Sequence, residues 1–575
     1  MEKRISLVAI ILGTLALVLI ARLGFWQIVK GGEFSKLARA QYLTGEEISA
    51  ERGSIIASDG MPLATSQISW KVWADPQKID KSPLELASIL GPLIIDHKFK
   101  EATDAAKLVF LKDEEERIKK VLGQEEKRWV LVSDKVSDET LRNMETLNLR
   151  GFGWDKTSSR FYPEASTAAH LLGFVGKDEK GDRGYFGLEG FYDETLSGKS
   201  GFLRQEKDLR GNPIPFGFFS QIPANNGLDI ITYIDRGVQY IAEKSINEGL
   251  EKYGAKTGSI VIMKPTGEIL AMASAPAYEP ERYNEVGQEV LKNPVVADSF
   301  EPGSVFKILI MAAGIDAGVV RPETKCDICT APVQIGKYAI RTWDDRYHPD
   351  STMEEVIVKS DNTGMVFVGN RIGKDKMYDY LKRFGIGRST GIDLEDEAVP
   401  SMREEGKWGD IDLATASFGQ GIAITPIQLM RAGAAIANHG ILPTPRIVEK
   451  IQGGGFEQKI PIQDEGRIIS PEAADEITKM MIAAVKYGES KWAAPRGFVV
   501  AGKTGTAQIP ISGHYDPNKT MASFIGFAPA DNPKFVMLIT LREPSSSPWA
   551  SETAAPLWFQ VAKELFPYFG IQPSQ

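Results

Sequence analysis

Residues 497–508 read GFVVAGKTGTAQ, and their first eight letters satisfy G-x-x-x-x-G-K-[ST], the spacing of a nucleotide-binding P-loop. A P-loop needs a flexible loop before its lysine and a helix after its Ser/Thr. Here FVVA is typical of a strand, and the glycine after the threonine and then Pro510 oppose a helix. We therefore expect a strand along the edge of a cleft, with Lys503 and the hydroxyls of Thr504 and Thr506 facing an anionic group.

Ser304 and Lys307 form the only S-x-x-K of the chain, inside the apolar segment SFEPGSVFKILIMAAGIDAG (299–318). The Pro-Gly pair before the serine and the glycine that closes the segment are typical helix boundaries. Because positions i and i+3 share one helix face, Lys307 Nζ can reach Ser304 Oγ. A serine nucleophile needs a neighbouring base, and an apolar setting favours a neutral lysine. The alternative is a capping serine followed by an ordinary helix lysine.

Two further motifs are weak by themselves. Ser360-Asp361-Asn362 offers a hydroxyl and an amide that can relay a proton and bind a substrate amide, but Ser245-Ile246-Asn247 has the same S-x-N pattern inside a predicted helix. K-T-G also occurs twice, at 256–258 in a predicted connection and at 503–505 after a predicted strand. The three motifs occur in the order S-x-x-K, S-x-N, K-T-G, and each lies in a suitable local context. This combination is more significant than any one of the motifs alone.

The N-terminus carries an uncharged apolar run from Ile5 to Ala21, directly after Lys3 and Arg4. With the following four residues, at about 1.5 Å per residue, it can cross a bilayer core of about 30 Å. A cleavable signal has an apolar core of roughly 7–15 residues and a small-residue cleavage site. We therefore predict an uncleaved, single-pass membrane anchor, in preference to a signal or a buried core helix. The preceding basic residues favour a cytoplasmic N-terminus and an extracytoplasmic chain from about Gly31 onward.

Composition excludes several classes of protein. A formal net charge of −9 leaves no basic surface for nucleic acid. The five histidines lie far apart, so we expect no metal site. Cys326 and Cys329 form a C-x-x-C without the two further ligands that zinc needs. In an exported domain they are either a local disulfide or two thiols, with a thioredoxin-like role as a third alternative.

The pattern of predicted helices and strands changes near residue 228. Before it, short strand-like runs alternate with charged helical patterns, and RGNPIPFGFFSQIPANNG (210–227) is typical of exposed connection. After it, we predict a helix at 238–254, the hairpin GSIVIM-KPTG-EILAMAS, and a helix at 425–440 with Thr425 as N-cap. A strand at 534–541 and a helix around 553–566 complete the pattern.

The three motifs together resemble those of class B penicillin-binding proteins. The resemblance runs almost end to end, and it extends to ERGSIIASDGMPLA (51–64), where Ala57 and Ser58 replace the usual Asp-Arg, and to RFYPEASTAAHLLGFVG (160–176), GLEGFYDETLSGKSG (187–201) and ATASFGQGIAITPIQL (414–429). It implies an α+β protein with three parts. Residues 1–30 are the cytoplasmic stub and transmembrane helix, and 31–225 an elongated, non-catalytic α+β pedestal of the dimerisation type. Residues 226–575 form a transpeptidase domain like that of serine β-lactamases, with a central antiparallel sheet flanked by helices.

The resemblance also implies a mechanism without cofactor or metal. The nucleophile Ser304 attacks the carbonyl between two D-alanines of a peptidoglycan stem peptide, and Lys307 takes its proton. Backbone N–H groups of Ser304 and Thr506 form the oxyanion hole. Ser360 passes a proton to the leaving D-alanine, and Asn362 binds the donor peptide. The terminal carboxylate of that peptide is bound by Lys503, Thr504, Gly505 and Thr506.

The blocks at 160–176 and 187–201 are most similar to the septal, FtsI type, which implies β-lactams as ligands and a membrane glycosyltransferase and division proteins as partners. Three alternatives remain open: an elongation-type transpeptidase, a membrane-anchored β-lactam sensor or β-lactamase, and a non-enzymatic division scaffold. A class A β-lactamase needs a glutamate-containing deacylation motif soon after S-D-N. Residues 363–400 offer only Glu395 and Glu397 in a polar turn.

Overall fold

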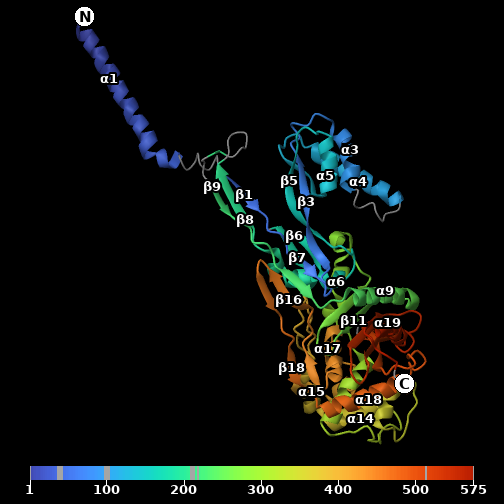
Figure 1. Ribbon diagram of the computed structural model, residues 1–575. Coiled ribbons are helices and arrows are strands. Elements are labelled where there is room, and N and C mark those ends of the chain that lie inside the picture. Colours follow the sequence, from blue (N-terminus) through green and yellow to red (C-terminus); the bar gives the residue numbers. More distant parts are fainter. Residues whose placement is uncertain are drawn as a thin grey trace. The chain divides into compact units, whose positions relative to one another are not determined.

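The computed structural model describes residues 2–34, 43–95, 104–179, 181–206, 214–215, 219–511 and 514–573 (Figure 1). The chain divides into two compact units that interleave along the sequence. The first comprises the described parts of Met1–Arg52, Ser69–Ser158 and Ser197–Gly227, and the second those of Gly53–Ile68, Ser159–Leu196 and Leu228–Gln575.

The first element is α1 (Glu2–Gly24), which continues into a π-helical turn, η1 (Phe25–Val29). None of its side chains is buried. The combined span of 28 residues is the one helix, within the described parts of the chain, long and apolar enough to cross a membrane. The apolar run predicted at 5–21 is therefore a continuous helix with its hydrophobic side chains uncovered, as a candidate membrane span requires.

The first unit contains two sets of paired strands. One is the sheet β1-β8-β9, formed by Leu43–Ile48, Gly201–Glu206 and Phe219–Ile222. The other joins the end of β3 (Pro62–Ala74) to β4 (Val130–Val136) and β5 (Phe152–Phe161), with α3 (Pro83–Ile95), α4 (Asp104–Leu122) and α5 (Asp138–Thr146) packed around one apolar cluster. Strand β9 lies in the stretch predicted as connection, and that prediction was wrong there because these four residues pair antiparallel with the preceding strand β8. Residues 210–213 and 216–218 of the stretch lie outside the described residues.

The second unit is built on a five-stranded sheet, β12-β11-β21-β20-β19, in which every pairing is antiparallel. Its strands are β11 (Thr257–Met263), β12 (Ile269–Ala275), β19 (Ala501–Ile511), β20 (His514–Ala528) and β21 (Phe535–Arg542). Strand β21 is the predicted strand at 534–541, and β11 and β12 are the predicted hairpin. The predicted K-T-G strand is present as β19, which lies at one edge of the sheet.

Both faces of this sheet are covered by helices. On β11, Ile260 and Ile262 belong to an apolar cluster with α9 (Arg236–Tyr253) and α19 (Ala554–Tyr568), whereas Val261 belongs to a second apolar cluster, formed mainly by other helices. Alternate residues of a strand point to opposite faces, so the two clusters lie on opposite sides of the sheet. Figure 1 shows α9 and α19 beside β11.

The second cluster is the larger one. It is formed by α12 (Lys307–Asp316), α13 (Met353–Val358), α14 (Asn362–Ile372), α15 (Lys374–Arg383), α16 (Asp410–Ala416), α17 (Pro426–Ala437) and α18 (Pro471–Tyr487). Helix α17 begins with a capping box in which the Thr425 hydroxyl accepts from Gln428 N and Gln428 Oε1 accepts from Thr425 N. The predicted N-cap is therefore confirmed, as are the predicted helices α9 and α19.

Shorter elements complete the second unit. The strands β17-β16-β10-β2 and the start of β3 form a further sheet, and β6–β7, β13–β14 and β15–β18 are two-stranded. These strands are β2 (Ile55–Ile56), β6 (Phe174–Asp178), β7 (Gly181–Tyr185), β10 (Asp229–Thr232), β13 (Val333–Ile335), β14 (Tyr338–Ile340), β15 (Ile441–Pro443), β16 (Val448–Gly453), β17 (Phe456–Lys459) and β18 (Asp464–Arg467). The short helices are α6 (Ala169–Leu172), α7 (Gly187–Phe191), α8 (Asp193–Ser197), α10 (Gln288–Leu291), α11 (Pro294–Ala297), η3 (Pro280–Glu285), η4 (Gly303–Phe306) and η5 (Glu405–Lys407).

Candidate active site

Ser304 lies in η4, a single 3-10 turn directly before α12. Gly303 precedes it with φ +58°, a conformation that favours glycine, and Gly303 N donates to Gly419 O at 2.9 Å. A Cβ on Gly303 would lie 3.0 Å from Thr506 O on β19. The predicted helix start is thus present but begins as a tighter turn, because the α-helix proper starts at Lys307, and this turn rests against the K-T-G strand.

Lys307 is fully buried and donates three hydrogen bonds. Its acceptors are Ser360 O at 2.6 Å, Ser360 Oγ at 3.2 Å and Asn362 Oδ1 at 2.8 Å. Ser304 Oγ is half-exposed and has no hydrogen-bond partner among the described residues. The predicted bond from Lys307 to Ser304 is therefore not made, because the S-x-N turn occupies all three donors of the ammonium group.

The S-x-N motif forms the sharp turn between α13 and α14. Ser360 has φ +56°, and Asp361 caps α14 by accepting from Thr363 N and Thr363 Oγ1, each at 2.7 Å. Asn362 Nδ2 donates to Arg341 O at 2.9 Å, which fixes the orientation of its amide. The turn consequently presents the hydroxyl of Ser360 and the amide oxygen of Asn362 to Lys307.

The K-T-G strand supplies the second buried amine. Lys503 is 3% exposed, and its Nζ lies 3.1 Å from Ser360 Oγ and 3.2 Å from Thr504 Oγ1. A Cβ on Gly505 would lie 2.7 Å from Val305 Cγ1, so this position admits only glycine without displacing η4 from β19. The Thr506 hydroxyl accepts from a backbone N–H in the loop after β21, that of Ala550, at 3.0 Å.

Burial changes the protonation of both lysines. Removal from water, and secondly the neighbouring charge of Lys503, hold the pKa of Lys307 well below its usual value. Burial also lowers the pKa of Lys503 to about 8. Near neutral pH the pair can therefore contain one neutral amine, able to accept a proton, and one ammonium, able to attract an anion.

The sequence-predicted residues thus meet at one place in the second unit. Hydrogen bonds join Lys307, Ser360, Asn362, Lys503 and Thr504. Backbone packing between η4 and β19 brings in the remaining three, Ser304, Gly505 and Thr506.

Sequence reasoning missed an aromatic pair next to this group. Trp343 and Trp549 are 49% and 38% exposed, and their rings meet edge to face with centroids 5.4 Å apart. The loop of Trp343 contributes the Arg341 carbonyl that binds Asn362, and the loop of Trp549 contributes the N–H that binds Thr506. The sequence signal that could have indicated this pair is two tryptophans in polar segments that have no helix or strand pattern.

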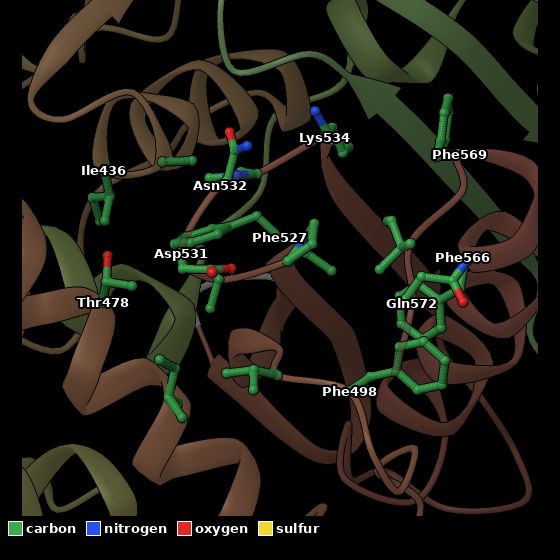
Figure 2. A pocket seen from close by; sticks show the side chains of 18 of the residues that line it. Ile436, Thr478, Phe498, Phe527, Asp531, Asn532, Lys534, Phe566, Phe569 and Gln572 are labelled. Carbon is green, nitrogen blue, oxygen red and sulfur yellow. The ribbon is translucent and has the colours of Figure 1, made fainter. Parts of the chain in front are cut away.

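Cys326 and Cys329 form a local disulfide, which decides against two free thiols. Among the described residues, no group of three or more His, Cys, Asp and Glu side chains is arranged to hold a metal ion. A cavity of about 680 Å³ with Phe498, Phe527, Phe566 and Phe569 in its wall contains none of the predicted site residues (Figure 2).

A buried lysine beside a serine turn, an S-x-N turn and a K-T-G edge strand of an antiparallel sheet define a penicillin-binding serine acyltransferase. The chain matches the family model of the penicillin binding protein transpeptidase domain over residues 258–565, and that of the penicillin-binding protein dimerisation domain over residues 47–232. It belongs to the class B penicillin-binding proteins and is a peptidoglycan D,D-transpeptidase.

Curated relatives resemble the chain over nearly its whole length. Stage V sporulation protein D of Bacillus subtilis is 31% identical, covering 100% of this chain and 86% of that protein. The probable peptidoglycan D,D-transpeptidase PenA of Neisseria gonorrhoeae is 30% identical over 100% and 94%. Peptidoglycan D,D-transpeptidase FtsI of Escherichia coli is 27% identical over 96% and 90%.

Solved structures show the same fold. Penicillin-binding protein 3 of Mycobacterium tuberculosis, in complex with aztreonam, superposes with a TM-score of 0.69 at 25% identity, over 92% of this chain and 98% of that one. Penicillin-binding protein 2X of Streptococcus thermophilus gives a TM-score of 0.74 at 22% identity, over 92% and 81%. The two-unit α+β architecture predicted from the sequence is therefore that of this family. Peptidoglycan as substrate and β-lactams as ligands fit the same assignment.

Proposed function

We propose that Ser304 is the acylated nucleophile and Lys307 its base. The single observation that carries this proposal is the shared Ser360 hydroxyl, which lies within hydrogen-bonding distance of both Lys307 and Lys503. This hydroxyl connects the S-x-x-K, S-x-N and K-T-G motifs, which lie far apart in the sequence, into one proton-transfer unit. Catalytic hydrogen bonds are often incomplete in a free enzyme and tighten with substrate, so a half-exposed Ser304 Oγ suits a nucleophile that awaits its substrate.

In the acylation step, Ser304 Oγ attacks the carbonyl carbon between the two D-alanines, and its proton passes to neutral Lys307. The backbone N–H groups of Ser304 and Thr506 stabilise the oxyanion. The C–N bond then breaks, Ser360 gives its proton to the leaving amine, and Lys307 replenishes Ser360 over the 3.2 Å between them.

Deacylation runs through the same groups in reverse. The amine of a second stem peptide attacks the ester carbonyl, its proton passes through Ser360 to Lys307, and Ser304 leaves with a proton from the lysine.

Asn362 binds the donor peptide, and charged Lys503 with Thr504, Gly505 and Thr506 binds the terminal carboxylate of that peptide. Lys503 serves this purpose because a compact ammonium on an edge strand attracts a carboxylate and is desolvated together with it.

We further propose the boundaries 1–30 for the anchor, 31–225 for the pedestal and 226–575 for the catalytic part. The N-terminus is cytoplasmic, because Lys3 and Arg4 precede the span, and the catalytic part that follows the span is therefore extracytoplasmic. A membrane glycosyltransferase that supplies the glycan strand is the partner that this placement requires.

Among the family's roles we propose cross-linking at the division septum. Support comes from the blocks at 160–176 and 187–201 and from the similarity to FtsI. Stage V sporulation protein D is more similar, and it supports a second candidate, cross-linking in a spore envelope. Depletion separates these roles: filaments indicate a septal role, round cells an elongation role, and normal growth with defective spores the sporulation role.

The chemical proposal is tested with the full chain in detergent and a fluorescent penicillin. Wild-type protein becomes covalently labelled and keeps the label for long, whereas Ser304→Ala is not labelled. Rapid turnover of a chromogenic cephalosporin would instead indicate a β-lactamase, and absence of any labelling a scaffold.

A further inference from the structure

The block ATASFGQGIAITPIQL (414–429) contains none of the residues that perform the proposed chemistry. It runs from the end of α16 through a turn at 417–424 to the N-cap of α17. Two glycines of this 417–424 turn, Gly419 and Gly421, have φ +81° and +69°, a conformation that favours glycine. The sequence thus builds a sharply bent segment between two helices of the catalytic unit.

The 417–424 turn packs on the residues that lead to the nucleophile. Phe300 and Ile424 form an isolated antiparallel bridge, with backbone hydrogen bonds of 2.9 and 3.0 Å. Gly303 N donates to Gly419 O at 2.9 Å, and a Cβ on Gly419 would lie 2.2 Å from Gly303 O. Gly303 O and the N–H of Ser304 belong to one planar peptide group. The turn therefore lies directly against the peptide that carries the N–H of the nucleophilic residue.

Glu301 adds a side-chain contact to these backbone contacts. Its half-buried carboxylate accepts, through Oε1, a hydrogen bond from Gly421 N at 3.1 Å. Because the acceptor is a carboxylate, this bond is stronger than one between neutral groups. Glu301 lies two residues before Gly303, and Gly421 lies two residues after Gly419, so the bond joins the same two segments. Loss of the carboxylate would loosen the 417–424 turn from the peptide group that it contacts.

The orientation of the Gly303–Ser304 peptide group affects the first chemical step. Its N–H is one of the two donors proposed for the oxyanion, and such donors act only when they are aimed at the position that the oxyanion will occupy. A displacement of about 1 Å in a reacting geometry can cost about 10²-fold in rate. A group that fixes this peptide therefore affects the acylation rate more than the initial binding of a penicillin.

We infer that Glu301 is a positioning residue of the transpeptidase site, which holds the 417–424 turn against the Gly303–Ser304 peptide and so aims the N–H of Ser304 at the oxyanion. The inference rests on the proposed role of Ser304. In this role Glu301 acts through Gly421 and Gly419 rather than on the substrate itself. The block at 414–429 thereby acquires a function, the support of the nucleophile turn.

The test is stopped-flow acylation of the full chain in detergent over a range of penicillin concentrations. It separates the dissociation constant of the noncovalent complex from the acylation rate constant. Glu301→Ala removes the acceptor, and Glu301→Gln keeps an oxygen at the same reach without the charge. Glu301→Asp keeps the charge but ends one methylene short of Gly421 N. Glu395→Ala is the matched control, because Glu395 Oε2 likewise accepts from a backbone N–H, that of Phe186 at 2.6 Å, and bonds to none of the site residues.

Glu301→Ala and Glu301→Asp should lower the acylation rate constant by about 10-fold or more and leave the dissociation constant within about 2-fold of wild type. Glu301→Gln and Glu395→Ala should keep both constants within about 3-fold of wild type. Each rate is compared at equal folded fraction, determined by thermal denaturation, so that a loss of folded protein is not counted as a loss of rate.

Three results would overturn the inference. They are a wild-type rate in Glu301→Asp together with a loss in Glu301→Gln, which would indicate an effect of charge; a loss confined to the dissociation constant; and an equal loss of rate in Glu395→Ala. If the penicillin adduct of the wild-type sample is not on Ser304, the proposed function itself fails. Mass spectrometry of that sample distinguishes this failure from a failure of the inference alone.

Discussion

Lys307 and Lys503 donate hydrogen bonds to the same hydroxyl, Ser360 Oγ, at 3.2 and 3.1 Å. Two buried ammonium groups around one oxygen repel each other, and both are removed from water. The arrangement therefore favours the loss of one proton. Burial, and secondly the charge of Lys503, hold the pKa of Lys307 well below its usual value, and burial lowers the pKa of Lys503 to about 8.

The pH dependence of acylation follows from this pair. Lys503, with a pKa of about 8, is charged below that pH and neutral above it, so acylation by a penicillin should decline as pH rises through about 8. A bound carboxylate favours the charged amine, so the decline should occur at higher pH under saturating than under limiting penicillin. Stopped-flow acylation measurements check both points. A rate that stays constant to pH 10 would contradict the role of Lys503.

Arginine substitutions separate the roles of the two lysines. A guanidinium remains charged at all accessible pH, so it can attract a carboxylate but cannot act as a base. Lys307→Arg should lose acylation by about 10²-fold or more, whereas Lys503→Arg should keep a substantial part of it. Each variant's rate is compared at equal folded fraction, determined by thermal denaturation. Equal losses in the two variants would argue against distinct functions.

The close approach of η4 and β19 gives a prediction about glycine. A Cβ on Gly505 would meet Val305 and the Ser523 hydroxyl below 3.0 Å, and both belong to elements that cannot shift freely. Gly505→Ala should therefore destabilise the protein by about 1–3 kcal/mol and slow acylation, because it separates β19 from the Ser304 turn. Gly406→Ala is the matched control, since its Cβ would meet nothing within 4 Å. A Gly505→Ala variant with wild-type melting and acylation would refute the proposed tight packing.

A buried ion pair stabilises the second unit away from the site. Arg160 Nε donates to Glu189 Oε1 at 2.6 Å, and Arg160 Nη1 donates to Gly53 O at 2.7 Å. Glu189→Ala removes this carboxylate from the buried guanidinium, which should cost about 3–5 kcal/mol. Glu476, on α18, forms a surface ion pair with Lys479 at 2.7 Å, and its removal in Glu476→Gln should cost under about 1 kcal/mol. Thermal denaturation of the full chain compares the two, and equal melting temperatures would show that the buried pair contributes little.

The sequence predicted the main elements of the catalytic unit because their signals are local. Periodicity and caps indicated α9, α17 and α19, and alternation with turn residues indicated the β11–β12 hairpin. Strand β9 was missed because it has only four residues and lies among glycine- and proline-rich neighbours that are typical of connection. Its own residues do not report that it pairs with β8.

The site was predicted as a set of residues, but not as a network. Motif order indicated that Ser304, Lys307, Ser360 and Lys503 act together, yet spacing along a helix favoured a bond from Lys307 to Ser304. The structure instead directs Lys307 to the S-x-N turn, since that turn supplies three acceptors in the tertiary fold.

The account's central claim is that one serine, Ser304, is acylated with the help of the two buried lysines. Mass spectrometry of proteolytic fragments of the full chain after exposure to penicillin tests it most directly. The account predicts one penicilloyl adduct per chain, on the fragment that contains Ser304, absent in Ser304→Ala and strongly reduced in Lys307→Arg. An adduct on any other residue, or one that persists in Ser304→Ala, would contradict it.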